Sequence, residues 1–517
     1  MTSKDTPPRS NHIVFWGLTI HKTIFPLSLL FILAFVSASM IAPNWTATTL
    51  TQYRGWITAN LDAFILIIMN LCVLMCFAII ILPWGKIRLG GKDAKPEYSK
   101  LAWFTMLFTA GTGVGLIFWG VAEPVAYYTD WYGTPLGVPP RTPEGANMAM
   151  ATALFHWGLH PWSIYVIIGL SVGYFTYNRG RPEAMSSALE PLLGLKGSQG
   201  VPGQIIDIFA ILLTTFALAS SLGLGSLQAV AGSHYVFGLP LHFGMQVLFI
   251  ALTTLVATLS VSLGIRKGIR ILSTTNFTLA VILLVFVIFS TGLFRYVGQL
   301  LHNFTQYAYH FTALSSWINR EDREWYQGWT VYYWVWWAVW APLAGVFLAK
   351  VSKGRTLRQM VVASMIVPML FSSLWLTGLG NGAIDQIREG VGPLVGGITS
   401  VDLSIFHFLS SLPFTALTGV LVMLLVMLFM VTSIDSGALV VDTLASGGNK
   451  STLRRQKALW VFVIGLTSAS VLYVGGNTAL NAIQAVTIVM GLPLMLILLV
   501  LIAGFLKALY QDTRAPK

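Results

Sequence analysis

Residues 101–126 have the sequence LAWFTMLFTAGTGVGLIFWGVAEPVA, and this stretch decides the class of fold. It is longer than the roughly 20 mainly apolar residues that an α-helix needs to cross the hydrocarbon core of a bilayer. Similar stretches recur along almost the whole chain. Of the 517 residues, 55% are hydrophobic and only 10% are charged, and the mean hydropathy is +0.73. The sequence therefore indicates an all-α polytopic membrane protein, with lipid as its main solvent.

Apolar runs between breaker residues predict twelve transmembrane helices. Their approximate ranges are 24–43, 62–82, 101–126, 147–176, 204–236, 242–263, 272–298, 327–350, 357–378, 411–443, 458–475 and 481–508. We find no typical cleavage site before the first span, so we expect that span to remain as a helix and not to be removed as a signal peptide.

The net charge of +12 is explained by topology and does not indicate a nucleic-acid partner. With a cytoplasmic N-terminus, 25 of the 31 Lys and Arg residues fall in inside segments and six fall outside. Such a bias is what the positive-inside rule produces when both ends are cytoplasmic. We expect a multi-pass protein of a bacterial inner membrane, in contact with the lipid bilayer.

Three alternate glycines interrupt the third span, in the run Gly111-Thr112-Gly113-Val114-Gly115. Glycine costs about 1 kcal/mol relative to alanine inside a helix, and open backbone at membrane depth is tolerated only within protein or around a cavity. The run therefore predicts either a broken helix at a binding site or tight helix packing through small residues. No strand precedes it, which excludes a nucleotide-binding loop.

Aromatic residues are concentrated in two spans. In the eighth span five tryptophans occur within twelve residues, and helical spacing places four of them on one face with Tyr333. The five tryptophans are Trp329, Trp334, Trp336, Trp337 and Trp340, and all but Trp334 lie on that face. The fourth span adds Trp157, Trp162 and Tyr165. The electron-rich faces of aromatic rings attract a cation at about 2 kcal/mol per desolvated contact, so a quaternary ammonium or a sulfonium is the natural guest.

The glycine run, the sequence Gly-Val-Ala-Glu-Pro at 120–124, the Trp-rich span and the sequence Ala-Lys-Val-Ser-Lys-Gly-Arg-Thr at 349–356 together resemble the betaine/choline/carnitine transporter family. This resemblance covers nearly the full chain. It implies twelve spans, of which the last ten form two inverted five-helix repeats of the LeuT type, and a homotrimer. The glycines at 111–115 and the segment 341–345 are then expected to interrupt the first helix of each repeat.

The resemblance divides the chain into six parts. We expect a cytoplasmic N-terminus, two N-terminal helices with a cytoplasmic loop, a first repeat, an interfacial helix with an external loop, a second repeat and a cytoplasmic tail. Their ranges are 1–23, 24–100, 101–298, 299–326, 327–508 and 509–517.

The family's substrate residues can be placed one by one. Its aromatic box falls on Trp157, Trp162, Tyr165 and Trp337. Trp329 resembles a tryptophan of the outer vestibule, whereas Trp334, Trp336 and Trp340 resemble residues that line the site and the inward path. A substrate carboxylate is expected near the opened backbone at Thr112, Gly113 and Gly115, where free N–H groups can receive it.

The resemblance also implies Na⁺ as the coupling ion, and no cofactor. The shared sodium site would use backbone carbonyls of Thr109, Thr112 and Phe429 and the hydroxyls of Thr432 and Ser433. Sodium-independent exchangers of the family carry an Arg and a Met where this chain has Asn276 and Ala344. A second sodium site of betaine symporters involves a Phe where this chain has Leu343. Asp435 is either functional or a structural partner of the sodium site.

Gly115 points to the substrate class. Choline carriers of the family place an aspartate there, which supplies the negative charge that choline lacks and would repel the acid group of a zwitterion. The neutral glycine favours zwitterions such as glycine betaine or dimethylsulfoniopropionate, and the box alone does not separate ammonium from sulfonium.

Several alternatives remain open at this point. They are a proton-coupled choline or carnitine carrier, a carnitine exchanger, a channel and a membrane-embedded enzyme. The pair His156 and His160 could share a metal ion, although no third ligand is evident nearby. The short segments outside the first and last spans predict little direct activation by osmotic stress.

Overall fold

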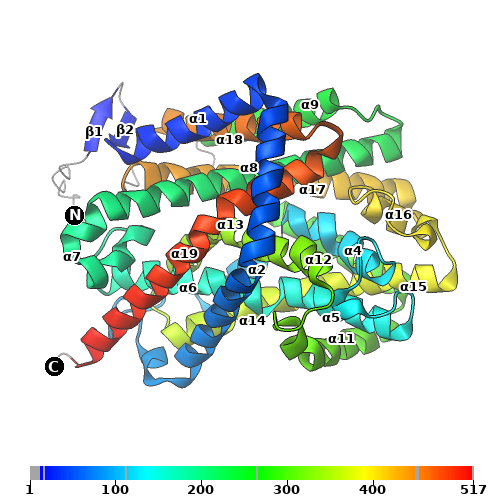
Figure 1. Ribbon diagram of the computed structural model, residues 1–517, viewed down its shortest axis with the longest axis horizontal. Coiled ribbons are helices and arrows are strands. Elements are labelled where there is room, and N and C mark those ends of the chain that lie inside the picture. The colour runs from blue at the N-terminus through cyan, green and yellow to red at the C-terminus, as the bar shows by residue number, and fades with distance from the viewer. Residues whose placement is uncertain (1–11, 16–17, 111–112, 264–265, 449–452, 515–517) are drawn as a thin grey trace.

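The computed structural model describes residues 12–15, 18–110, 113–263, 266–448 and 453–514, and nearly all of them are helical (Figure 1). The one sheet among them is a hairpin of two four-residue strands, β1 (His12–Phe15) and β2 (Leu18–His21), paired antiparallel. The all-α prediction is therefore right for the spans, while the segment before the first span forms a short hairpin.

Ten segments of the described chain are long and apolar enough to cross a membrane. They are α1 (Ile24–Ile41), α2 (Pro43–Ile81), α8 (Val201–Phe237), most of α9 (Phe243–Leu263), most of α10 (Arg266–Thr291), the segment Arg323–Val351 that ends in α13 (Tyr332–Val351), the segment Leu357–Glu389 that begins with α14 (Leu357–Leu376), α17 (Thr415–Ala445), α18 (Arg454–Gly475) and most of α19 (Ala479–Arg514).

The predicted third and fourth spans are not among these ten, and each is divided into two helices. The third consists of α3 (Lys100–Ala110) and α4 (Val114–Tyr128), and the fourth consists of α5 (Pro143–Trp157) and α6 (Leu159–Tyr177). The expected interruption of the third span is thus confirmed by the ends of its two helices. A total of twelve spans stays a prediction.

The second expected interruption, at 341–345, is wrong. Helix α13 runs without a break from Tyr332 to Val351, with Pro342 inside it. Gly345 instead allows close packing: a Cβ added there would lie 2.5 Å from Cγ2 of Ile168, and one added to Gly169 would lie 3.0 Å from the Gly345 carbonyl oxygen. The small residues therefore bring α13 against α6, as small residues do between membrane helices.

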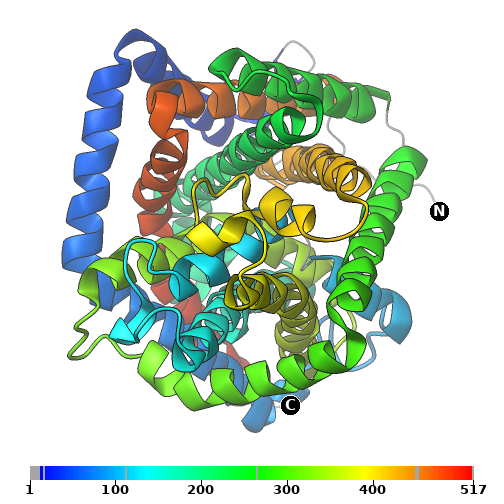
Figure 2. The same ribbon diagram turned by 90° about the vertical axis from the view of Figure 1, so that its right-hand side faces the viewer.

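Short helices and turns complete the chain. They are η1 (Pro83–Lys86), η2 (Pro135–Gly137), η3 (Met185–Leu189), α7 (Glu190–Gln199), α11 (Leu293–Leu314), α12 (Arg323–Tyr326), the π-turns η4 (Gln327–Val331) and η5 (Thr377–Asn381), α15 (Gly382–Glu389), η6 (Pro393–Gly396), α16 (Ser404–Ser410) and η7 (Gly476–Thr478). Figure 2 looks onto the end formed by α4, α5, α15 and α16 and shows α11 running around its rim. That α11 lies in the membrane interface stays a prediction.

Segments that the charge pattern assigns to the same side of a membrane do meet at one end of the bundle. The last turns of α19 lie at the end with β1 and α7 (Figure 1), and Asp512 of α19 pairs there with Arg179 at 2.8 Å. Arg88 donates to the Gly354 carbonyl oxygen at 2.6 Å and so joins two further segments of the same predicted side. At the other end, Arg141 donates to the carbonyl oxygen of Val395 at 3.0 Å. The two sides are therefore distinct, whereas which one faces the cytoplasm stays a prediction.

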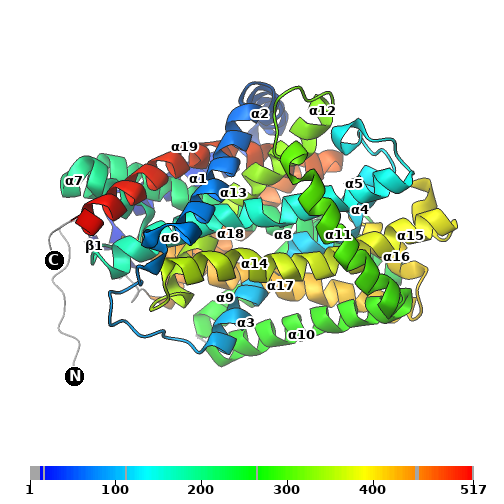
Figure 3. The ribbon, with the colours of Figure 1, turned by 90° about the horizontal axis from the view of Figure 1, so that it is seen from below.

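Most long helices run in similar directions between these two ends, and α2 and α11 cross them (Figure 3). In the interior, α13 packs on α6 and α8, and α17 packs on α8 and α10. This arrangement brings the aromatic helices of the sequence pattern to one side of an internal cavity and the hydroxyl-bearing helix α17 to the other.

Candidate substrate and ion site

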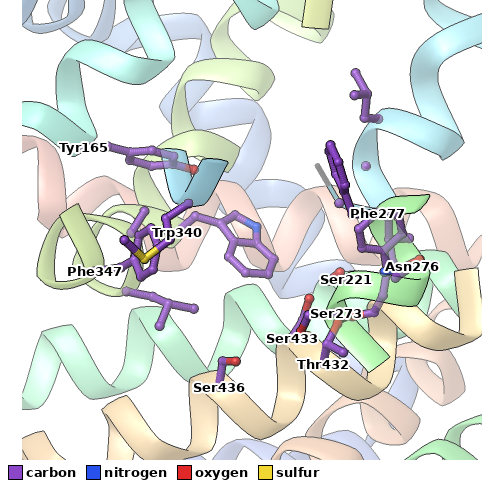
Figure 4. Close-up of a pocket in the computed structure, with 18 of the residues that line it drawn as sticks. Tyr165, Ser221, Ser273, Asn276, Phe277, Trp340, Phe347, Thr432, Ser433 and Ser436 are labelled. Atoms are coloured by element: carbon purple, nitrogen blue, oxygen red, sulfur yellow. Dashed lines mark hydrogen bonds between the residues drawn. The ribbon is translucent and has the colours of Figure 1, made fainter. Parts of the chain in front are cut away.

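A cavity of about 590 Å³ lies between these helices, within the range of about 300–1,000 Å³ that is typical of small-molecule sites. Its aromatic side is formed by Trp157, Trp162, Tyr165, Trp336, Trp337 and Trp340. Its polar side is formed by Ser221, Ser273, Thr274, Asn276, Thr432, Ser433 and Ser436. Figure 4 shows Tyr165 and Trp340 across the opening from Ser273, Thr432 and Ser433.

A helix break at Gly158 arranges the first half of the aromatic side. Gly158 separates α5 from α6, and a Cβ there would lie 2.5 Å from the Leu154 carbonyl oxygen and 3.0 Å from the Tyr307 hydroxyl oxygen, so only glycine fits. The break lets Trp157 end one helix while Trp162 and Tyr165 occupy the first turns of the next.

Helix α13 supplies the second half. The ring centroid of Trp337 lies 5.1 Å from that of Trp157, 6.3 Å from that of Trp162 and 5.8 Å from that of Tyr165. The rings of Trp157 and Trp337 are close to perpendicular, at 84°. The four predicted box residues therefore do come together around one space, and all four are buried.

The indole nitrogens of the box differ in their partners. Nε1 of Trp337 donates to the His156 carbonyl oxygen at 2.8 Å, and Nε1 of Trp157 donates to Oε2 of Glu123 at 2.7 Å. Nε1 of Trp162 is buried with no hydrogen-bond partner among the described residues. Two walls of the box are thus tied to the protein by hydrogen bonds, and a third is held by packing.

Glu123 lies behind Trp157 at the centre of a buried polar cluster. Its Oε1 accepts from His156 Nδ1 at 2.8 Å and from the Tyr127 hydroxyl at 3.0 Å. Its Oε2 accepts from the Tyr333 hydroxyl at 2.6 Å as well as from Trp157. The cluster joins α4, α5 and α13, and Trp157 is its one member among the described residues that line the cavity.

Part of the predicted sodium site lies on the polar side. Phe429, Thr432 and Ser433 of α17 line the cavity, and the Thr432 hydroxyl donates to the carbonyl oxygens of Leu428 at 2.9 Å and Phe429 at 3.2 Å. Its lone pairs remain available to a cation. Thr109 lies in the last turn of α3, and Thr112 lies outside the described residues.

The start of α4 also faces the cavity. Gly113 and Gly115 line it together with Val114, and Gly113 is the residue before the first turn of α4. A Cβ added to Gly115 would lie 2.3 Å from Cη2 of Trp336. Gly115 is therefore required as much by the indole packed against it as by any need for a loosened helix.

Two of the predicted tryptophans lie away from this cavity. Trp329 lines a separate hollow of about 1,050 Å³, together with Trp131, Trp325 and the acidic residue Asp130. Trp334 is fully buried behind the box and stacks on His160 with ring centroids 5.3 Å apart. The ring of Tyr333 lies between the two hollows, 6.4 Å from Trp329 and 5.9 Å from Trp336.

Other residues singled out in the sequence have clear positions. Asn276 and Ala344 line the cavity, as does Leu343. Asn276 is 2% exposed, and its Oδ1 has no hydrogen-bond partner among the described residues. Asp435 is buried in α17 but is not among the described residues that line the cavity. His160 binds Asn70 at 2.9 Å, so the two histidines have separate polar partners.

Comparison with known proteins identifies the chain. A sequence model of the BCCT, betaine/carnitine/choline family transporters, matches residues 23–514. The chain belongs to this family. It is therefore a membrane transporter and not an enzyme, and the resemblance seen in the glycine run and the Trp-rich span is confirmed.

Named members of the family are similar over nearly the whole chain. Glycine betaine transporter 1 of Vibrio parahaemolyticus is 41% identical over 515 residues, which cover 99% of this chain and 98% of that protein. A glycine betaine/proline/choline/ectoine transporter of the same organism is 39% identical, over 97% of this chain and 89% of that protein. The glycine betaine transporter OpuD of Bacillus subtilis is 34% identical, over 96% of each chain.

Sequence reasoning missed two parts of this BCCT site. The hydroxyl residues of α8 and α10 that line the cavity gave no pattern of their own, because Ser and Thr also occur at helix packing contacts. Glu123 could have been found, since a carboxylate within a span is a functional candidate by default. Asp435 attracted attention instead, although Glu123 is the acid that touches the box.

Proposed function

We propose that this protein is a secondary active symporter that imports a zwitterionic onium compound, such as glycine betaine or dimethylsulfoniopropionate, together with Na⁺. The observation that carries the proposal is a single cavity lined both by the four aromatic rings of the box and by a group of hydroxyl side chains. An onium ion needs the aromatic surface, and a hard cation such as Na⁺ needs the hydroxyl oxygens.

The aromatic box suits a methylated cation. Its rings expose electron-rich faces and a hydrocarbon surface, which together favour a charge spread over methyl groups. No Asp or Glu is among the described residues that line the cavity, so the rings provide its attraction for a cation. For a compact, strongly hydrated ammonium ion, the free energy of hydration lost in the cavity would exceed the free energy gained from contact with the rings.

The start of α4 suits the other end of a zwitterion. The first N–H groups of a helix lack intrahelical partners and carry partial positive charge, so they favour a carboxylate. Gly113, Val114 and Gly115 bring this end of α4 to the cavity wall, next to Trp157 and Trp336. The neutral Gly115 leaves the carboxylate without a repelling neighbour.

The polar side suits Na⁺ as cargo. Two hydroxyl oxygens, of Thr432 and Ser433, and the nearby Phe429 carbonyl supply hard oxygen ligands, and carbonyls of Thr109 and Thr112 would complete the set. Neither Asn276 nor Ala344 is a residue that replaces sodium in the family's exchangers. One ion per cycle is the simplest stoichiometry, because Leu343 stands where a second site would need a phenylalanine.

The remaining architecture follows from family membership. We propose a LeuT-like pair of inverted repeats, a homotrimer and a bacterial inner membrane with both termini in the cytoplasm. The meeting of the basic segments at one end of the bundle supports this orientation. The names of the relatives in Vibrio and Bacillus support betaine as the first substrate to test.

Reconstituted protein tests the proposal directly. In proteoliposomes, an inward Na⁺ gradient is expected to drive accumulation of labelled glycine betaine, and replacing Na⁺ with K⁺ is expected to abolish it. Betaine and dimethylsulfoniopropionate should compete with each other, and choline should compete weakly. Accumulation driven by a proton gradient without Na⁺, or a preference for choline, would support the proton-coupled alternative instead.

Counterflow separates a carrier from a channel. Vesicles preloaded with unlabelled betaine are expected to take up labelled betaine transiently, since a carrier exchanges its substrate and an open pore does not.

A further inference from the structure

The Glu123 side chain is fully buried and surrounded by four donors. Its two carboxylate oxygens accept from His156, Tyr127, Trp157 and Tyr333, at distances between 2.6 and 3.0 Å. An ionised carboxylate is a pure acceptor with about four lone-pair positions, so it satisfies all four donors at once. A protonated carboxyl would accept fewer of these bonds, because its own O–H would need one of the four neighbours as an acceptor.

The contacts of this cluster fit an ionised Glu123. His156 Nδ1 lies 2.8 Å from Glu123 Oε1 and 3.2 Å from the Tyr127 hydroxyl oxygen, and it is the donor to an ionised carboxylate. His156 Nε2 lies 3.0 Å from the Thr330 hydroxyl, which can donate to it in a neutral imidazole. Among the described residues, His156 is the only basic side chain within ion-pair distance of Glu123. With Glu123 ionised and His156 neutral, the cluster holds one negative charge next to Trp157 of the box.

This charge reaches the box through one ring. Trp157 is the box residue whose Nε1 donates to the carboxylate, at 2.7 Å, while the Nε1 of Trp162 has no partner among the described residues. Hydrogen bonds to charged acceptors are short and strong, and bonded groups polarise one another at low dielectric. An indole that donates to an anion has a more electron-rich face and so attracts a cation more strongly.

We propose that Glu123 is a positioning and specificity-determining residue of the cage: it fixes the Trp157 ring and, through the Nε1 hydrogen bond, strengthens its attraction for the positive end of the substrate. The proposal rests on the proposed onium substrate. Part of the preference for a cation then comes from a residue that does not line the cavity. Trp157 and Trp162 are both indoles of the same box, but Trp157 contributes more to the affinity for a cation.

The first test compares betaine with a neutral-headed analogue. In 3,3-dimethylbutanoate a carbon replaces the ammonium nitrogen, so the shape and the carboxylate stay while the positive charge is lost. We expect Glu123→Gln to raise the KM for betaine about tenfold, as for the loss of a charged hydrogen bond, with a smaller change in kcat. The inhibition constant of 3,3-dimethylbutanoate should change much less, so the preference for betaine should fall.

A double-mutant cycle shows which ring transmits the effect. Trp157→Phe removes the donor but keeps an aromatic ring, and Trp162→Phe is the matched control. After Trp157→Phe, adding Glu123→Gln should lower the betaine preference little further, because the contact is already gone. After Trp162→Phe, adding Glu123→Gln should lower it by the full factor.

The outcomes are distinct. Equal losses for betaine and its neutral analogue in Glu123→Gln, or full additivity with Trp157→Phe, would overturn the proposal and leave Glu123 a purely structural residue. If Glu123→Gln is not recovered as monodisperse protein, the two single Phe variants decide: Trp157→Phe should lower the betaine preference more than Trp162→Phe. Failure of the wild-type protein to bind betaine would refute the proposed substrate, independently of these comparisons.

Discussion

The two walls of the cavity are held in place in different ways. On the aromatic side, rings from α5, α6 and α13 contact one another, and hydrogen bonds from Trp157 and Trp337 link separate helices. On the polar side, the Thr432 hydroxyl bonds only to carbonyls of its own helix among the described residues. The aromatic wall is thus a preformed surface, whereas the polar wall depends on how α17 lies against its neighbours.

We therefore expect the two walls to have different roles in transport: the aromatic wall binds the substrate, and the polar wall binds the ion. A rigid cage keeps its affinity for the onium group while the surrounding helices move. Hydroxyl ligands on a helix that can shift would assemble or separate a sodium site as the conformation changes. Mutations on the two walls should therefore have different signatures.

The largest effect is expected at the aromatic wall. Trp337→Leu removes the ring that touches all three other box residues and also its bond to the His156 carbonyl oxygen. At about 2 kcal/mol for a desolvated cation–π contact, betaine affinity should fall roughly 30-fold. Binding measured by isothermal titration checks this.

Trp460→Leu is the matched control, because Trp460 is a fully buried indole that is not among the described residues lining the cavity. It should lower stability without changing the dissociation constant for betaine. An unchanged affinity in Trp337→Leu would contradict the box.

A second prediction concerns the junction between α4 and the cage. Gly115→Asp is expected to weaken betaine transport and to favour choline, since it adds a carboxylate beside the cage. The structure adds a steric condition, because a Cβ at this position would lie 2.3 Å from Cη2 of Trp336. Choline uptake should therefore be clearer in Gly115→Asp combined with Trp336→Phe, which removes that atom.

Uptake of labelled choline and betaine by the single and double variants measures the shift. Trp336→Phe alone is the control and should not create choline transport. If the double variant still preferred betaine, the electrostatic account of Gly115 would be wrong.

On the polar wall the expected effect is on the ion. Thr432→Ala combined with Ser433→Ala removes two oxygens of the proposed sodium site, and the Na⁺ concentration for half-maximal uptake should rise about tenfold, equivalent to about 1.4 kcal/mol. Betaine uptake at saturating Na⁺ should change less.

Thr443→Ala provides the control for this pair. Thr443 lies on the same helix and makes the same type of bond to the carbonyl oxygen four residues earlier, but it is not among the described residues lining the cavity. Its Na⁺ dependence should match that of the wild type. Identical curves for all three proteins would point to another ion or another site.

The smallest effect is expected at Asn276, whose amide lines the cavity beside Ser273. Loss of one neutral hydrogen bond is worth about 1 kcal/mol, so Asn276→Ala should weaken betaine or Na⁺ binding about fivefold. Titration of each ligand at saturating concentration of the other shows which of the two it serves. Thr278→Ala, two residues along α10, should change neither.

The sequence by itself determined the class of protein, the family and most of the box. A membrane span needs a long apolar run, and an onium cage needs several aromatic rings at helical spacing, so both leave local patterns. The aromatic residues around Trp157, Trp162, Tyr165 and Trp337 and the glycine run before Val114 are such patterns, whereas the choice of these four as the box came from the family resemblance. The division of the fourth span at Gly158 was not found, because one glycine in a helix does not specify a break.

Only the tertiary structure decided which side chains meet. Pro342 and Gly345 predict an interruption, yet α13 continues through both because the glycine is used to pack against Gly169 of α6. Trp334 shares a helix with Trp337, but it stacks on His160 and is not among the described residues that line the cavity. Glu123 and Trp157 are far apart in the chain, and their 2.7 Å contact exists because α4, α5 and α13 pack together. Helical spacing fixes directions within one helix, whereas contacts between helices depend on how the whole bundle packs.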